Sequence, residues 1–234
     1  MATFVVSHGA WAAGWAWKKM HPLMAAKGHR LYTPSHTGLG ERSHLTGPNV
    51  DLELHITDIM NVIEYEDLRD VILIGHSYGG MVATGVADRM QDRVGTLVYV
   101  DAYAPRDGES IFDLVPERRK SMGEAARRDG DGWKMPPTPL AADTAPQDAP
   151  WANARRIAQP IKTFEQQLRL IHGEPPQPRH YIYCTRITAG DRFRPFLERA
   201  RAEGWGAYEL DAGHTPHVTA PEALMEILDR IARG

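Results

Sequence analysis

The sequence contains only one cysteine, Cys184, so no disulfide bond can form within the chain. Cys184 follows Tyr181, Ile182 and Tyr183 in what reads as the inside of a strand. We therefore interpret it as a small buried apolar residue rather than a reactive thiol.

Long apolar runs and concentrated charge are also missing. No stretch approaches the roughly 20 apolar residues that span a bilayer, and a strand-like run begins at residue 3 with no basic leader before it. The formal net charge is -3, and no Lys/Arg cluster is interleaved with aromatic residues, which argues against nucleic acid or a membrane as partner. We expect a cytoplasmic protein that acts on a small molecule, as a monomer or homodimer.

The composition that is present is that of a globular protein. Of 234 residues, 42% are hydrophobic and 24% are charged, which provides enough apolar surface to offset the entropy lost on folding. This length favours one domain with a large core over two domains and a linker.

Two hydrophobic periodicities alternate along the chain, which is typical of an α/β fold with a mainly parallel sheet and helices on both faces. We predict six strands, at residues 3–7, 30–33, 71–74, 94–100, 180–185 and 207–210. Helices are predicted at residues 16–27, 51–66 with Asp51 as N-cap, about 78–90, and 221–232.

Residues 105–178 break this alternation with short helical pieces and many prolines. So long an insertion between two sheet strands is unusual for a mere connector, and its large apolar residues need something to pack against. We predict that the chain, 1–234, is a single domain with a core at 1–104 and 179–234 and with the insertion, 105–178, as a helical lid over the strand ends.

The segment Gly75-His76-Ser77-Tyr78-Gly79 fits the pattern Gly-x-Ser-x-Gly between a predicted buried strand and a predicted helix. A tight strand-to-helix turn of this kind holds the serine hydroxyl above the edge of the sheet. The pattern alone is a weak signal, but its position makes Ser77 the candidate nucleophile.

A serine hydroxyl needs an imidazole to accept its proton, and in chains with this motif the histidine follows the acid late in the sequence. His214, in Ala212-Gly213-His214, lies just beyond the last predicted strand, at the edge of the sheet where Ser77 is expected. His217 is the nearest alternative. We expect no metal site, because no acidic or cysteine ligands accompany these two histidines.

Two backbone amides are candidates for an oxyanion hole, which binds the negative oxygen of a tetrahedral intermediate. His8-Gly9-Ala10 follows the first strand, from which such enzymes contribute one donor, and the residue after the nucleophile contributes the other. We assign these donors to the N–H groups of Ala10 and Tyr78.

Four segments together resemble the bacterial esterases related to plant methylesterases and hydroxynitrile lyases, and the resemblance spans nearly the whole chain. They are His8-Gly9-Ala10-Trp11 with Gly14-Trp15, Gly38-Leu39-Gly40-Glu41-Arg42-Ser43, Gly75-His76-Ser77-Tyr78-Gly79-Gly80 and Gly213-His214. The resemblance implies a six-stranded α/β-hydrolase core, no cofactor and small ester substrates. The plant lyases carry a lysine after the catalytic histidine and a threonine in place of the first-strand glycine; this chain has Thr215 and Gly9, so we do not expect cyanohydrin cleavage.

The acid of the triad has two candidates. In the plant methylesterases it follows the Cys-Thr pair of the penultimate strand within a few residues, but here Cys184-Thr185 is followed by no acid before Asp191. Asp101 instead ends the strand beside the nucleophile strand, where some dehalogenases and lactone hydrolases of this fold keep their acid. We favour Asp101 and keep Asp191 as the alternative.

The sequence thus predicts a serine hydrolase that cleaves a small carboxylic ester through an acyl-enzyme intermediate, with Trp11 and Trp133 as candidate pocket residues. The same residues would serve a lactone, thioester, amide or carbon–carbon bond. The alternative from a different functional class is a ligand receptor that has this fold but no catalytic activity. We expect His36 and His44, which flank the glycine loop, in solvent or against loop backbone.

Overall fold

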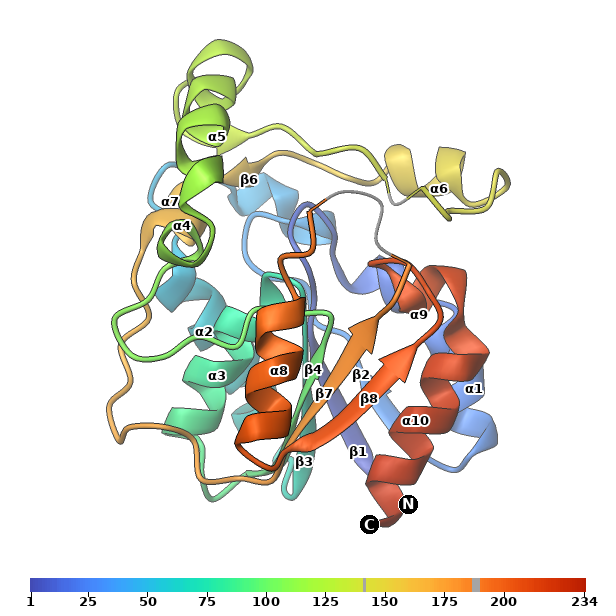
Figure 1. Ribbon diagram of the computed structural model, residues 1–234. Coiled ribbons are helices and arrows are strands. Elements are labelled where there is room, and N and C mark those ends of the chain that lie inside the picture. The colour runs from blue at the N-terminus through green and yellow to red at the C-terminus, as the bar shows by residue number, and fades with distance from the viewer. Residues whose placement is uncertain (141, 187–189) are drawn as a thin grey trace.

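A computed structural model of the chain describes residues 1–140, 142–186 and 190–234. At its centre is a six-stranded sheet with strand order β2-β1-β3-β4-β7-β8, in which all neighbouring strands run parallel (Figure 1). The strands are β1 (Thr3–Ser7), β2 (Arg30–Tyr32), β3 (Val71–His76), β4 (Val94–Val100), β7 (Arg179–Cys184) and β8 (Gly206–Leu210). The predicted α/β fold with six mainly parallel strands is confirmed.

Helices cover both faces of the sheet (Figure 1). One face carries α2 (Leu52–Tyr65), α3 (Gly79–Arg89) and α8 (Arg194–Ala202), and the other carries α1 (Met20–Ala26), α9 (Pro216–Thr219) and α10 (Pro221–Arg233). Because alternate strand residues point to opposite faces, two cores form: Val5 and Leu73 lie in the first, Phe4 and Ile72 in the second. Among the described residues, no helix has both the length and the apolar character needed to cross a bilayer.

The helix predicted at residues 16–27 is in fact two shorter pieces, a 3-10 helix η1 (Gly14–Trp17) and α1. Pro22 explains the later start of α1, because proline lacks a backbone N–H and is tolerated only in the first turn of a helix. The helix predicted at residues 51–66 is α2, and Asp51 caps it by accepting the Leu54 N–H at 3.0 Å. A second 3-10 helix, η2, spans Gly40–Leu45.

The insertion, residues 105–178, lies between β4 and β7. It forms α4 (Ile111–Leu114), α5 (Pro116–Asp129), β5 (Lys134–Met135), α6 (Ala149–Asn153), β6 (Gln159–Pro160) and α7 (Lys162–Glu165), and the antiparallel pairing of β5 with β6 was not predicted from the sequence. Figure 1 shows α5 and α6 on opposite sides above the carboxyl ends of β7 and β8. The division into a core and a lid stays a prediction.

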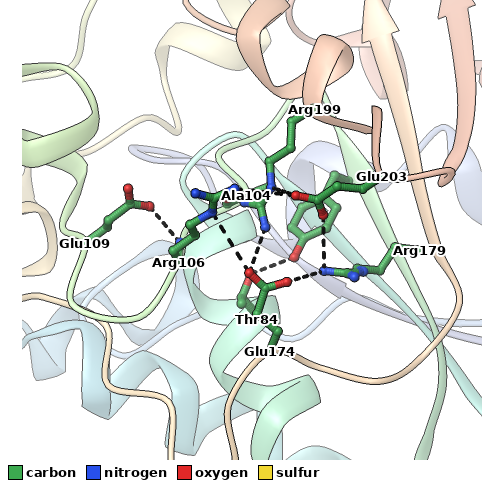
Figure 2. Close-up of polar contacts among 9 residues, drawn as sticks. Thr84, Ala104, Arg106, Glu109, Glu174, Arg179, Arg199 and Glu203 are labelled. Atoms are coloured by element: carbon green, nitrogen blue, oxygen red, sulfur yellow. Dashed lines mark hydrogen bonds and ion pairs between the residues drawn. The ribbon is translucent and has the colours of Figure 1, made fainter. Parts of the chain in front are cut away.

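A polar cluster ties both ends of the insertion to the core (Figure 2). Glu174, near the end of the insertion, accepts a hydrogen bond from Arg199 of α8 at 3.1 Å. Arg199 also donates to the Ala104 carbonyl at 3.0 Å, and Arg106, near the start of the insertion, lies 3.5 Å from Glu203 at the end of α8. Helix α8 therefore anchors both ends of the insertion.

Candidate active site

Ser77 lies on the turn between β3 and α3, and its backbone is left-handed, with φ 53°. The turn leaves no room for a side chain at Gly75 or Gly79. A Cβ at Gly79 would lie 2.0 Å from the Ser7 carbonyl oxygen, and one at Gly75 would lie 2.7 Å from the Cα of Gly80. A non-glycine residue with positive φ is strained, and such strain concentrates at functional sites. The turn places Ser77 in the wall of a cavity above the sheet.

His214 reaches this serine from the loop after β8. Its Nε2 atom lies 2.9 Å from Ser77 Oγ. The His214 carbonyl accepts a hydrogen bond from His76 Nε2 at 2.7 Å, and the preceding amide, of Gly213, donates to Asp143 Oδ2 at 2.6 Å. The loop is thus held from two sides, by the nucleophile strand and by the insertion.

Asp101 completes the arrangement from the end of β4. Its Oδ2 atom lies 2.7 Å from His214 Nδ1, and its Oδ1 atom accepts the Cys184 N–H at 3.1 Å. The carboxylate is buried, and the backbone of Asp101 is also left-handed, with φ 42°. Ser77, His214 and Asp101 therefore form one continuous hydrogen-bonded chain.

Asp191, the alternative acid, makes a different set of contacts. Its carboxylate accepts hydrogen bonds from the Tyr183 hydroxyl at 2.6 Å and from the backbone and side chain of Arg194 at 3.0 and 2.7 Å. Burial raises the pKa of Asp191, but the hydrogen bonds from Tyr183 and Arg194 lower it by more than burial raises it. The pKa of Asp191 therefore lies below its ordinary value. These are the contacts of a residue that closes the turn before α8.

Within the described part of the chain, neither the amide of Ala10 nor that of Tyr78 donates a hydrogen bond. The next amide along the first loop, that of Trp11, donates to Gln159 Oε1 at 2.9 Å. Trp11 has φ 59°, and its indole Nε1 donates to the Met135 carbonyl at 3.0 Å. The insertion therefore holds the loop that carries Ala10.

A sequence profile described as "Alpha/beta hydrolase family" matches residues 4–227. The chain belongs to the alpha/beta hydrolase family. A carbendazim hydrolyzing esterase from Nocardioides sp. (strain SG-4G) is 39% identical to this hydrolase over 239 residues, which cover 97% of this chain and 98% of that protein. Methylesterase 2 of Arabidopsis thaliana is 32% identical over 113 residues, 44% of this chain and 40% of that protein.

A solved structure is also similar to this hydrolase. It is an extracellular alpha/beta-hydrolase from a Paenibacillus species, described as sharing structural and functional homology with tobacco salicylic acid binding protein 2. It superposes with a TM-score of 0.84 at 28% identity, and the match covers 98% of each chain. The resemblance to esterases related to the plant methylesterases is confirmed.

The cavity over Ser77 has a volume of about 400 Å³. Core and insertion both line it, and the residues from the insertion include Arg118, Pro139, Arg156 and Phe164. Trp11 also lies in its wall.

Trp133 does not line this cavity, so the prediction that it is a pocket residue is corrected. It borders a separate depression together with Arg119 and Lys162. The Trp133 carbonyl accepts the Ile161 N–H at 2.8 Å, so its backbone is held beside Ile161, which borders the same depression.

Buried histidines beside the oxyanion position were not identified from the sequence. The Tyr78 hydroxyl donates to His55 Nδ1 at 2.8 Å, and His55 Nε2 donates to the Thr37 carbonyl at 2.9 Å. Burial lowers the pKa of His55 to about 4, so the imidazole stays neutral and accepts from Tyr78. In the sequence, the feature that could have identified His55 is its position among the residues of α2 that face the core.

The structure also describes the three other histidines considered from the sequence. His36 is buried, not in solvent, with its ring centroid 3.9 Å from that of His8, whereas His44 is exposed. His217 is buried and stacks on Trp17 at 4.4 Å, away from the position that His214 occupies beside the serine. In the part of the chain that the structure describes, no three His, Cys, Asp or Glu side chains are grouped to hold a metal ion.

Proposed function

We propose that this hydrolase is a serine esterase that cleaves a small carboxylic ester through an acyl-enzyme intermediate. The observation that carries the proposal is the hydrogen-bonded chain from Ser77 Oγ through His214 to Asp101, at the wall of a cavity of about 400 Å³. The names of the esterase relatives support an ester over another acyl bond.

In the first half-reaction, Ser77 attacks the ester carbonyl while Nε2 of His214 takes the hydroxyl proton. Asp101 accepts the Nδ1–H of His214, which keeps the imidazole in the required tautomer and stabilises the imidazolium that forms. His214 then gives its proton to the leaving alcohol. In the second half-reaction, water attacks the acyl-enzyme with the same help and releases the acid.

The amides of Ala10 and Tyr78 bind the oxyanion in this proposal. Removing one donor of this kind typically lowers turnover by about 10²–10³-fold. The anchoring of Tyr78 supports its role, because its hydroxyl is bonded to His55 and its ring stacks on Phe164 with centroids 5.5 Å apart. Such contacts hold a donor in place before the charge develops.

The insertion, residues 105–178, acts as a lid in this proposal. The cavity walls that it contributes support this role, as do the bonds from Gln159 to the Trp11 loop and from Asp143 to the His214 loop. A lid that shapes the cavity also selects the substrate.

The proposed location is the cytoplasm, and the proposed working form is a monomer or homodimer with a small-molecule ester as its partner. The buried, unpaired Cys184 fits a compartment in which thiols stay reduced.

Labelling with a fluorophosphonate probe tests the nucleophile. The wild-type protein should form one covalent adduct at Ser77, Ser77→Ala should form none, and the exposed-site control Ser43→Ala should react like wild type. The absence of an adduct in the wild type, under conditions that label a control esterase, would favour a non-catalytic receptor. A panel of matched ester, lactone, thioester and amide substrates then decides the bond, and turnover of a class other than esters would replace the ester proposal.

A further inference from the structure

Two arginines in the cavity, Arg118 and Arg192, form what we call the arginine pair. Arg118 comes from the first turn of α5 and Arg192 from the loop before α8, and both line the cavity that holds Ser77. No carboxylate in the described ranges forms an ion pair with either of them, although their sequence neighbours are paired. Arg119 lies 3.2 Å from Asp113, and Arg194 lies 2.7 Å from Asp191.

The other two arginines of the cavity wall are engaged by the protein. Arg186 lies 2.8 Å from Asp211, and Arg156 donates to the carbonyl of Thr138. Of these four arginines, only Arg186 forms an ion pair with a carboxylate of the described ranges, and Arg118 and Arg192 are the two whose guanidinium groups lie close to each other beside one tyrosine, Tyr103.

The arginine pair is close to the reacting serine through Tyr103. Both guanidinium groups lie near the Tyr103 hydroxyl, and the Tyr103 N–H donates to the Ser77 carbonyl oxygen at 3.2 Å. The Tyr103 ring also packs edge-on against Phe193 at 5.1 Å. Ser77, Tyr103 and the arginine pair line the same cavity, so a molecule bound at Ser77 shares that cavity with a positive region.

Keeping this pair in place is costly for the free protein. Burial, and next the positive charge of Arg192, lower the pKa of Arg118. Arg118 also lies in the first turn of α5, where the helix dipole disfavours a cation. The carboxylates that line the same cavity accept hydrogen bonds from other groups, and none of them forms an ion pair with Arg118 or Arg192; they are Asp101, Asp143 and Asp191.

We propose that the arginine pair binds a free carboxylate of the substrate, so that the preferred substrate is an ester that also carries an ionised carboxyl group. A guanidinium group presents paired N–H donors that match the two oxygens of a carboxylate, and the added negative charge offsets the repulsion within the pair. The inference rests on the proposed esterase function. Water adds across the acyl–oxygen bond, which releases the acid, the alcohol and one proton, while the remote carboxylate stays unchanged.

Matched pairs of chromogenic esters test the proposal. Mono(4-nitrophenyl) glutarate carries the carboxylate on the acyl part and 4-acetoxybenzoate carries it on the alcohol part, and each has a neutral methyl-ester counterpart of the same shape. We expect kcat/KM of the wild type for at least one anionic ester to exceed that for its neutral counterpart by about tenfold or more, since a hydrogen bond to a charged group adds binding. The preferred pair tells which part of the ester faces Arg118 and Arg192.

Variants of the pair separate charge from packing. Arg118→Met and Arg192→Met should each reduce the preference for the anionic ester by about tenfold. Arg118→Lys should restore part of it, because the charge returns without the planar fork. Arg119→Met, which changes the neighbouring paired arginine outside the cavity, should leave the preference and the rates as in wild type.

Equal kcat/KM for the anionic and neutral esters in the wild type would overturn the carboxylate site while leaving the esterase function intact. If neither ester is hydrolysed and the fluorophosphonate does not react, the esterase function fails, and the site is then decided by calorimetry. Glutarate should bind the Ser77→Ala variant but not the double variant that carries both Ser77→Ala and Arg118→Met. If glutarate does not bind Ser77→Ala, the carboxylate site is overturned. Stronger competition by inorganic phosphate than by glutarate at equal ionic strength would assign the pair to phosphate and also overturn the proposal.

Discussion

The ring of Phe193 stacks on the imidazole of His214, with centroids 5.0 Å apart and planes inclined by 10°. Hydrogen bonds to Ser77 and Asp101 fix the two nitrogen atoms of this imidazole. The ring can still tilt about the line that joins these two nitrogen atoms. The flat contact with Phe193 restricts that motion. Phe193 is therefore a positioning residue for His214.

Phe193→Ala should lower kcat by about tenfold, because displacing a catalytic group from its reactive geometry costs rate even when the chemistry is unchanged. KM should change less. Phe196→Ala is the matched control, since Phe196 packs on Tyr103 at 6.0 Å but has no ring contact with His214. Steady-state kinetics with a 4-nitrophenyl ester measure both, and an unchanged kcat for Phe193→Ala would contradict the positioning role.

The two acid candidates predict opposite outcomes. Asp101→Asn should lower kcat by about 10⁴-fold, by analogy with the same change in serine proteases, where the imidazole is left in the wrong tautomer. Asp191→Asn should cost far less activity and should instead lower thermal stability, because it weakens the turn before α8. Similar small losses in both variants would show that neither carboxylate serves His214.

The strands and the pair Ser77 and His214 were predictable because their signals are local: short apolar runs, and small residues around a serine between a strand and a helix. The choice between Asp101 and Asp191 was not local, since both follow parallel strands. It depends on the pairing of β4 with β7, which brings the Cys184 amide to Asp101. Periodicity does not reveal the direction of Trp133 either, because strands of two residues carry no alternation.

The loop with Ala10 depends on a residue far away in the sequence, Gln159. Gln159→Leu leaves the buried Trp11 N–H without its acceptor at 2.9 Å, so the left-handed backbone at Trp11 should relax. We expect kcat to fall by about tenfold, less than the loss of a whole oxyanion donor. Gln166→Leu removes a different bond between the insertion and the core, in which Gln166 Oε1 accepts the Glu53 N–H at 3.0 Å, and should leave kcat unchanged. If Gln159→Leu and Gln166→Leu have the same kcat, the proposed coupling between Gln159 and the loop of Ala10 is disproved.

Buried histidines should make the fold sensitive to mild acid. Burial lowers the pKa of His8 and His55 to about 4 and that of His217 to about 3, below the ordinary 6.5. Between pH 6.5 and about 4 the unfolded chain binds more protons than the folded one, so stability is lost as the pH falls. The loss is about 1.4 kcal/mol per pH unit for each such histidine.

Urea unfolding at near-neutral and mildly acidic pH measures this slope, above the range in which the carboxylates titrate. His55→Gln should reduce the slope by about one proton, while the exposed-site control His44→Gln should not. A free energy of unfolding that is the same at both pH values would exclude the effect.

The anchoring of the insertion through Arg106, Glu174 and helix α8 has an evolutionary consequence. A loop with tethered ends can grow or shrink cheaply, since each doubling of length costs only about 0.6 kcal/mol in closure entropy. The segment between the tethers is therefore free to change in length and sequence above an unchanged sheet, except where Gln159 and Asp143 hold the loops of Trp11 and His214. We expect substrate specificity to diverge through the rest of this segment while Ser77 and His214 keep their places.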